Sequence, residues 1–207
     1  MVKPVHLGIL ASGSGSNAEA IIKSCENGRL KGKTVVSVLI SDNPDAYCLE
    51  RAIMHNIPAI ICSRSGINSR EEHDRNIVTE LKKWDVELVV LAGYMRLISS
   101  YFLQEFPHRV INIHPALLPS FRGMHGYKDA VEYGVKITGI TVHFVDDQMD
   151  HGPIILQKSL EVVFEDTEET LKERGLKLEH EAFPEAIELY CEDRLEIIGR
   201  KVKIKPN

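Results

Sequence analysis

The sequence predicts an α/β fold with a mostly parallel, twisted sheet, helices on both of its faces and an antiparallel strand pair towards the C-terminus. Two observations lead to this fold class. Short runs of consecutive apolar residues alternate with segments of helical spacing in the first half of the chain, which is typical of strands that are covered on both faces. Polar segments follow several of these runs, and parallel sheets bind ligands at that end.

The first half of the chain contains five apolar runs of strand length. We expect strands at residues 6–11, 34–40, 57–62, 87–92 and 110–113. Between them, helical spacing predicts helices at residues 18–24, 46–56 and 69–84. Ser69 followed by Glu72 is a typical helix start, because the serine hydroxyl can accept the backbone N–H three residues on. This alternation predicts a Rossmann-like arrangement.

The chain after residue 124 follows a different pattern. A short helix is expected at residues 125–133, strands at 136–145 and 154–162, and a long amphipathic helix at 170–190. The two strands should pair antiparallel because only a short acidic loop separates them. Pro184 should kink or break the long helix. The basic tail, residues 199–207, is expected to form a short edge strand and a frayed end.

Composition and charge exclude several classes of protein. The chain has 207 residues, is 43% hydrophobic and 27% charged, and carries a net charge of −5, so we expect a soluble globular protein rather than a general nucleic-acid binder. No apolar run is long enough for a signal peptide or a membrane span. The four cysteines form no CxxC pair, which favours free thiols in the cytoplasm over a metal or disulfide site.

A turn rich in glycine and serine joins the first predicted strand to the first predicted helix. Its residues are Gly13, Ser14, Gly15, Ser16 and Asn17. A helix that begins at such a turn directs backbone N–H groups and its dipole at an anion, and Ser16 or Asn17 could cap the helix or bind the anion. An ordinary tight turn explains the same residues, since the GxGxxG and GKS/T motifs are both missing. The turn alone leaves both interpretations open.

The candidate catalytic residues are Asn112, His114 and a carboxylate of the acidic loop that contains Asp146, Asp147 and Asp150. Asn112 and His114 are two residues apart in a predicted strand, so their side chains should share one face. The acidic loop follows a second strand, where one of its carboxylates could pair with His114. An amide donor, an imidazole and a carboxylate can together stabilise an oxyanion and transfer protons near neutral pH. Each residue alone could equally be a turn or capping residue.

The combined pattern resembles the folate-dependent formyltransferases. The resemblance is carried by Asn112-Ile113-His114-Pro115, Leu117-Leu118-Pro119, Gly123-Met124-His125, His143-Phe144-Val145, Asp150 and Gly152-Pro153. The turn at residues 13–17, with Ile40-Ser41-Asp42 and residues 91–96, is similar to the branch of that family that formylates glycinamide ribonucleotide in de novo purine biosynthesis. The resemblance covers essentially the whole chain. It implies a single formyltransferase domain over residues 1–207, with a nucleotide- and phosphate-binding half at 1–109 and a catalytic and folate-binding half at 110–207.

The resemblance also implies the substrates and a role for each site residue. The formyl donor would be 10-formyltetrahydrofolate and the acceptor glycinamide ribonucleotide, with no metal, no nucleic acid and no membrane, in a monomer or homodimer. Asn112 and His114 would stabilise the oxyanion, and Asp150 would favour the charged His114 and assist proton transfer. Residues 13–17 would bind the substrate phosphate and Glu179 the glycinamide. The folate would contact Arg70, Met95, Arg96, Leu97, Val145 and Asp147.

A few positions depart from the family pattern or extend it. Gly126 follows His125 where relatives tend to carry another small residue, which could loosen that turn. Leu176 stands where relatives place a polar or basic residue near the phosphate, and Lys177 is one position further on. The Leu118-Pro119 bond is a candidate cis peptide on the same resemblance.

Two alternatives remain at this level. A formyltetrahydrofolate deformylase or another formyltransferase would use the same three catalytic residues, but each would be expected to bring an additional domain that 207 residues do not accommodate. A folate- or nucleotide-binding module without activity would be a different class of protein. The presence of Asn112, His114 and Asp150 together argues against it.

Overall fold

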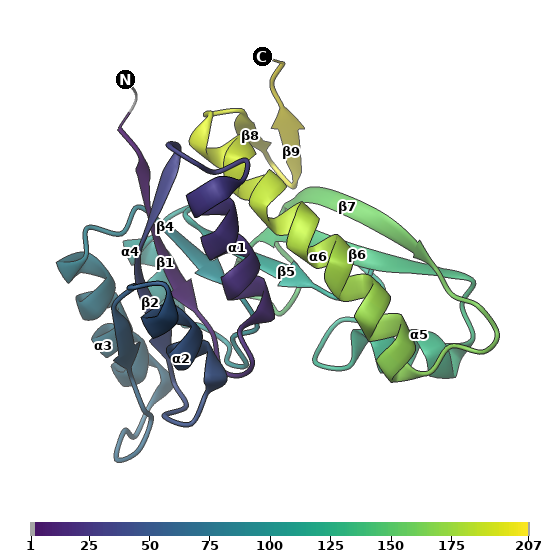
Figure 1. Ribbon diagram of the computed structural model, residues 1–207, viewed down its shortest axis with the longest axis horizontal. Coiled ribbons are helices and arrows are strands. Elements are labelled where there is room, and N and C mark those ends of the chain that lie inside the picture. Colours follow the sequence, from purple (N-terminus) through teal and green to yellow (C-terminus); the bar gives the residue numbers. More distant parts are fainter. Residues whose placement is uncertain (1–2, 207) are drawn as a thin grey trace. The chain divides into compact units, whose positions relative to one another are not determined.

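A computed structural model describes residues 3–206 of the chain (Figure 1). The chain forms two compact units, which are Met1–Ile111 (unit 1) and Asn112–Asn207 (unit 2). The sequence-based expectation of an α/β fold with mostly parallel strands and an antiparallel strand pair in the second half is confirmed. Each unit is described by itself.

Unit 1 is built on four parallel strands in the order β3-β2-β1-β4. The strands are β1 (Val5–Leu10), β2 (Thr34–Ser41), β3 (Ala59–Ile61) and β4 (Leu88–Leu91). They alternate with helices α1 (Ser16–Asn27), α2 (Tyr47–Met54), α3 (Arg70–Lys83) and α4 (Ser100–Glu105). The predicted strands and helices are all present, whereas the six-residue helix α4 was not expected.

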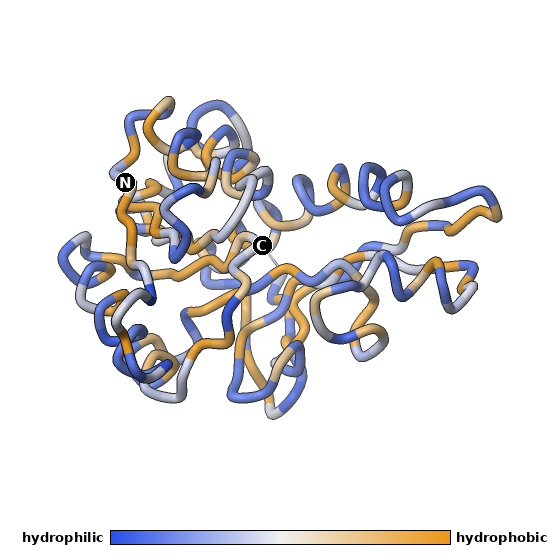
Figure 2. Tube along the Cα trace, turned by 90° about the horizontal axis from the view of Figure 1, so that it is seen from below, coloured by the Kyte–Doolittle hydropathy of each residue, from blue (hydrophilic) through white to orange (hydrophobic). Residues whose placement is uncertain are grey.

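Strands β1 and β4 of unit 1 are buried on both faces over most of their length, whereas β3 is partly exposed. Leu7, Ile9 and Leu10 of β1 are all fully buried, and Figure 2 shows the chain that follows the N-terminus in the orange of hydrophobic residues. A Cβ added at Gly8 would lie 2.4 Å from a methyl carbon of Leu81 on α3, so the glycine lets that helix pack directly on the strand. The N-terminus of α3 is capped as predicted, because the Ser69 hydroxyl accepts the backbone N–H of Glu72 at 3.0 Å.

Unit 2 contains an antiparallel pair covered by a long helix. The pair is formed by β6 (Ile137–Phe144) and β7 (Ile154–Glu161), in which Ile140 lies opposite Lys158. Helix α6 (Glu168–Cys191) packs against both strands and against α5 (Gly126–Tyr133), as Figure 1 shows in yellow-green in front of the two strands. The remaining strands are β5 (Val110–His114), β8 (Leu195–Ile198) and β9 (Lys201–Ile204).

Two expectations for the C-terminal half need correction. Pro184 was expected to kink or break the long helix, and the break is absent, because α6 runs as one helix through it. Pro184 is itself buried, next to the fully buried Phe183, and packing along this face compensates for the missing backbone hydrogen bond. The tail does not form the edge of the sheet. β9 lies between β7 and β8, and β8, which was not expected, takes the edge position in unit 2 because a two-residue turn folds it back beside β9.

The Leu118-Pro119 peptide is cis, as the resemblance implied. Cys25, Cys48, Cys62 and Cys191 are all free thiols. Among residues 3–206, no helix has both the length and the apolar character needed to cross a membrane, and no cluster of three or more His, Cys, Asp or Glu side chains has the arrangement of a metal site.

Candidate active site

The three candidate catalytic side chains meet in unit 2. His114, at the end of β5, is 3% exposed, and its Nε2 lies 2.7 Å from the carbonyl oxygen of Phe121. A carbonyl only accepts, so Nε2 carries a proton and donates it. The other ring nitrogen, Nδ1, lies 3.4 Å from an oxygen of Asp150. Nδ1 is therefore the ring nitrogen that faces the carboxylate of Asp150.

A second histidine, His143 on β6, orients the amide of Asn112. Nδ1 of His143 donates to the carbonyl of Phe144 at 2.8 Å, which leaves Nε2 as an acceptor for the Asn112 amide nitrogen at 3.2 Å. Burial lowers the pKa of His143 from its usual 6.5, so the ring stays neutral and can accept. An amide nitrogen carries two hydrogens. With one donated to His143, the second can be donated to a substrate oxygen.

Asp150 is held at a tight position in the loop between β6 and β7. Its backbone is left-handed, with φ of 49°, and one carboxylate oxygen accepts the backbone N–H of Gly123 at 2.9 Å. The other carboxylate oxygen lies 3.9 Å from Nε2 of His143. The carboxylate thus faces both histidines and accepts a backbone hydrogen bond. Val145 and Asp147, expected to contact folate, lie on this same loop.

The glycine-rich turn of unit 1 begins helix α1, but the expected side-chain cap is wrong. The N-cap residue is Gly15 rather than Ser16 or Asn17, its φ is 71°, and no side chain caps the helix. A Cβ at Gly15 would lie 2.5 Å from the Cβ of Cys48 on α2, so the turn is pressed against that helix. The first N–H groups of a helix have no intrahelical partner, and this end of α1 therefore suits an anion.

Two residues of helix α2 donate hydrogen bonds to backbone carbonyl groups of the glycine-rich turn. The backbone N–H of Cys48 donates to the carbonyl of Gly13 at 3.0 Å, and the Arg51 side chain donates to the carbonyl of Ser14 at 2.8 Å. Arg51 also pairs with Glu19 on α1. These contacts fix the turn without using its N–H groups. Arg51 was not identified from the sequence, because an arginine on a helix face is usually a surface residue.

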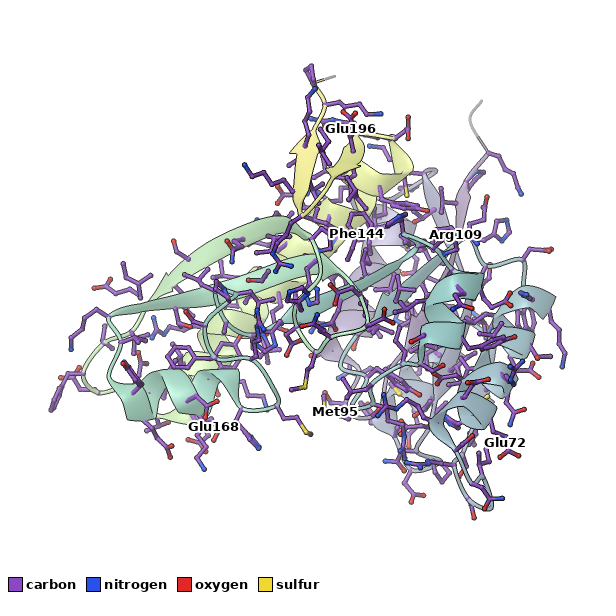
Figure 3. The ribbon with its side chains drawn as sticks, turned by 180° about the vertical axis from the view of Figure 1, so that it is seen from behind. Glu72, Met95, Arg109, Phe144, Glu168 and Glu196 are labelled. Carbon is purple, nitrogen blue, oxygen red and sulfur yellow. The ribbon has the colours of Figure 1, made fainter. Side chains whose placement is uncertain are left out.

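A cationic pocket in unit 1 brings together four of the predicted folate-contacting residues. The pocket has a volume of about 230 Å³, and its lining comprises Arg64, Arg70, His73, Asp74, Met95, Arg96 and Leu97. Three of these seven side chains are arginines, so the pocket suits an anionic ligand. Met95 and Leu97 are both largely exposed, and Figure 3 labels Met95 on the loop after β4. Arg64 was not predicted, since it lies in a polar loop that offers no pattern.

A buried carboxylate fixes Arg96 and the loop that carries it. The two oxygens of Asp42 bind the Arg96 guanidinium and the Ser12 hydroxyl, the latter at 2.6 Å. The Ser12 hydroxyl in turn accepts the backbone N–H of Met95 at 2.9 Å, and the Ser12 N–H donates to the carbonyl of Gly93 at 3.1 Å. The loop after β4 is thereby tied to the residue that precedes the glycine turn, as expected for two loops at one end of a parallel sheet.

Comparison with known proteins identifies the family. The family model described as Formyl transferase matches residues 6–187. The chain belongs to the formyl transferase family. It is 42% identical to the phosphoribosylglycinamide formyltransferase of Bacillus subtilis over 86% of this chain and 91% of that protein. It is 37% identical to the enzyme of the same name from Escherichia coli, over 93% and 90% of the two chains.

Solved structures of the formyl transferase family have the same fold. The crystal structure of glycinamide ribonucleotide transformylase 1 from Symbiobacterium toebii superposes with a TM-score of 0.96 at 45% identity, covering 100% of this chain and 96% of that one. Phosphoribosylglycinamide formyltransferase from Anaplasma phagocytophilum gives 0.91 at 36% identity, over 99% and 96% of the two chains.

Within this formyl transferase, Glu179 has a partner that the sequence did not reveal. Glu179 is 5% exposed and accepts the hydroxyl of Tyr127 at 2.6 Å. Burial, followed by the charge of Glu179, raises the pKa of Tyr127, so the phenol stays protonated and donates. Gly175 makes room for this pair, because a Cβ there would lie 2.0 Å from the tyrosine oxygen. Tyr127 and Glu179 are 52 residues apart, too far for any local pattern to indicate the contact.

The departures from the family pattern have different structural outcomes. A Cβ at Gly126 would lie 2.6 Å from the carbonyl oxygen of Pro115, the residue after His114. Gly126 therefore allows close packing here rather than loosening the turn, which corrects the expectation. Leu176 is half-buried on α6 and Lys177 is exposed.

Proposed function

We propose that this chain transfers the formyl group of 10-formyltetrahydrofolate to the amine of glycinamide ribonucleotide. The products would be formylglycinamide ribonucleotide and tetrahydrofolate, in the cytoplasmic synthesis of purines. The membership of the formyl transferase family and the relatives named phosphoribosylglycinamide formyltransferase support this reaction. The chain would act as a single formyltransferase domain comprising both units, as a monomer or homodimer.

The transfer would proceed directly through a tetrahedral intermediate. The amine nitrogen attacks the formyl carbon, and the electron pair of the carbonyl double bond moves to oxygen, which becomes an oxyanion. Asn112 and protonated His114 would donate hydrogen bonds to that oxygen. The bond from carbon to N10 of the folate then breaks, N10 takes up a proton, and the former amine loses one. Asp150 would pass this proton between the two nitrogens through water.

The observation that best supports this mechanism is the position of Asp150 beside Nδ1 of His114. Nε2 is committed to the Phe121 carbonyl, so the only nitrogen available to the oxyanion is the one that faces the carboxylate. An imidazolium in this position would be a stronger donor than a neutral ring. The Asn112 amide, oriented by neutral His143, supplies the second donor.

The remaining predicted residues would bind the two substrates. We assign the phosphate of the nucleotide to residues 13–17, because the N-terminus of α1 lacks a side-chain cap. We assign Glu179, held by Tyr127, to the glycinamide end. Arg70, Met95, Arg96 and Leu97 would bind the folate donor in the cationic pocket of unit 1. We also assign Val145 and Asp147 to the folate. The assignment requires no metal.

A spectrophotometric assay with a 10-formyl folate analogue tests the proposal. We expect release of the deformylated folate only when glycinamide ribonucleotide is present, and loss of that turnover in His114→Ala. Folate release that does not need the nucleotide would instead identify a hydrolase. Binding of folate without turnover on any amine would identify a binding module.

A further inference from the structure

The loop that carries Asp150 is closed by a short neck. The backbone N–H of Phe144 donates to the carbonyl of Pro153 at 2.9 Å, and a Cβ at Gly152 would lie 1.9 Å from the carbonyl oxygen of Phe144. Only glycine fits between these strands. These contacts therefore fix the two ends of the loop. They do not fix the conformation of the residues between those ends, which must depend on other contacts.

Inside the loop, Asp146 and His151 form a bridge across its width. Nδ1 of His151 lies 2.7 Å from one oxygen of Asp146 and donates to it, since a carboxylate accepts. The other oxygen of Asp146 accepts the backbone N–H of Gln148 at 3.0 Å. This bridge joins a residue before Asp150 to the residue after it. Both lie in the loop, so the bridge does not anchor the loop to the rest of unit 2.

That anchor comes from Arg200, the second residue of the turn between β8 and β9. Its Nη2 donates to the carbonyl of His151 at 2.6 Å, and its Nη1 lies 3.1 Å from Nε2 and 3.3 Å from Nδ1 of the same histidine. The guanidinium thus binds the carbonyl with one nitrogen and lies against the imidazole ring with the other. Gly199 precedes it with a φ of 59°, as a two-residue hairpin turn requires. Figure 3 shows this hairpin in yellow, with Glu196 labelled on it.

We propose that Arg200 is a positioning residue for the transfer reaction, acting through His151 to hold the carboxylate of Asp150 against His114. His151 follows Asp150 directly, so fixing its carbonyl and ring fixes the peptide that leaves Asp150. Asp150 needs such support, because its left-handed backbone is costly for a residue other than glycine. This inference rests on the role of Asp150 in the proposed function.

The test replaces Arg200 with methionine in the full chain. Arg200 is exposed, so R200M creates no buried cavity. We expect kcat to fall about ten- to hundred-fold, as a displacement of a reacting group by about 1 Å can cause, with the KM for glycinamide ribonucleotide nearly unchanged. Arg200→Lys should recover little activity because an ammonium lacks the guanidinium fork. Lys203→Met is the matched control, since Lys203 lies on the same hairpin and pairs only loosely with Glu196, at 3.8 Å.

A double-mutant cycle with Asp150→Asn distinguishes positioning from a general loss of stability. If Arg200 acts through Asp150, then R200M should lower kcat in the parent protein and have almost no further effect in the Asp150→Asn background. Equal fold-losses in both backgrounds would overturn the proposal. An unchanged kcat in R200M, with only a lower melting temperature, would also overturn it and leave Arg200 as a structural anchor.

Amide hydrogen exchange provides a readout that does not depend on catalysis. In R200M we expect faster exchange at residues 146–151, with unchanged exchange in β1 of unit 1. If Asp150→Asn keeps full turnover, the catalytic role proposed for Asp150 fails, yet the exchange experiment still reports whether Arg200 holds the loop. Unchanged exchange in R200M would show that it does not.

Discussion

Nε2 of His114 donates to the carbonyl oxygen of Phe121 at 2.7 Å, and this contact turns the other ring nitrogen, Nδ1, towards Asp150. Phe121 has a left-handed backbone, with φ of 49°, and lies seven residues after His114 in the chain. Because Nε2 is committed to Phe121, the ring is held in one orientation, with Nδ1 3.4 Å from the Asp150 carboxylate.

Replacing Asn112 with alanine should reduce turnover strongly without unfolding the protein. The loss of one oxyanion donor typically costs about 10²–10³ in kcat, and Asn112 is only half-buried, so the truncation opens little of the core. Steady-state kinetics and thermal unfolding measure the two effects separately. Asn27→Ala, at the exposed end of α1, is the control. Full activity in Asn112→Ala would remove the amide from the mechanism.

The stability of the protein should depend on pH through His143. Burial lowers the pKa of its ring below the usual 6.5 in the folded state, so the unfolded chain binds its proton first as the pH falls. The contribution of His143 to the free energy of unfolding is therefore fully present above pH 6.5. It is lost as the pH falls from 6.5 to the lower folded pKa, at a rate of at most about 1.4 kcal/mol per pH unit.

Denaturant unfolding of the parent protein and of His143→Gln at several pH values checks this dependence. Glutamine does not titrate, so the difference in unfolding free energy between the two proteins should change between pH 7 and pH 5, with the parent losing more. A difference that stays constant across this range would mean that His143 is not held neutral by burial.

Gly15 should tolerate alanine poorly, and Gly32 provides the comparison. Both glycines have positive φ, 71° and 75°, but a Cβ at Gly15 would lie 2.5 Å from Cys48 while Gly32 has nothing within 4 Å. Gly32→Ala should therefore cost only the backbone strain, about 1–2 kcal/mol. Gly15→Ala should cost more and also raise the KM for glycinamide ribonucleotide, because the turn must move away from α2. Equal losses of stability and equal KM values would contradict this.

Removing the Arg96 guanidinium should weaken binding of the folate donor. Arg96→Leu deletes a charge from the cationic pocket and leaves the Asp42 carboxylate without its partner. A charge-assisted hydrogen bond contributes about 1.5–3 kcal/mol, so we expect the KM for the donor to rise roughly ten- to hundred-fold, and its dependence on salt to weaken. Arg75→Leu is the control, since Arg75 is exposed on α3, pairs with Glu71 and lies over the Tyr101 ring.

Much of the fold and of the candidate site could be predicted from the sequence, because these features depend on local patterns. The strands of unit 1 are apolar runs, and Asn112 and His114 share one face of β5 through simple alternation. Asp150 was found because the resemblance to a family marked it. The same resemblance grouped Arg70 with the residues 95–97, and the pocket of unit 1 contains all four.

The features that were missed depend on contacts between distant positions. His143 orients Asn112 across 31 residues, and a lone histidine in a strand gives no indication of its partner. Arg51 binds a carbonyl 37 residues earlier. Pro184 was expected to break a helix because local propensity disfavours proline there, and burial of the surrounding face outweighed it. Sequence reasoning fails here because packing and long-range hydrogen bonds determine these features.

The hairpin turn at Arg200 also has a consequence for the order in which the protein matures. Arg200 leaves the ribosome 49 residues after the histidine that it binds, whereas unit 1 is complete much earlier and domains generally fold as they emerge. A nascent chain paused within α6 would carry a folded unit 1, while the loop around Asp150 would still lack its contact with Arg200. We therefore expect activity to appear late in synthesis, when the final hairpin has been made.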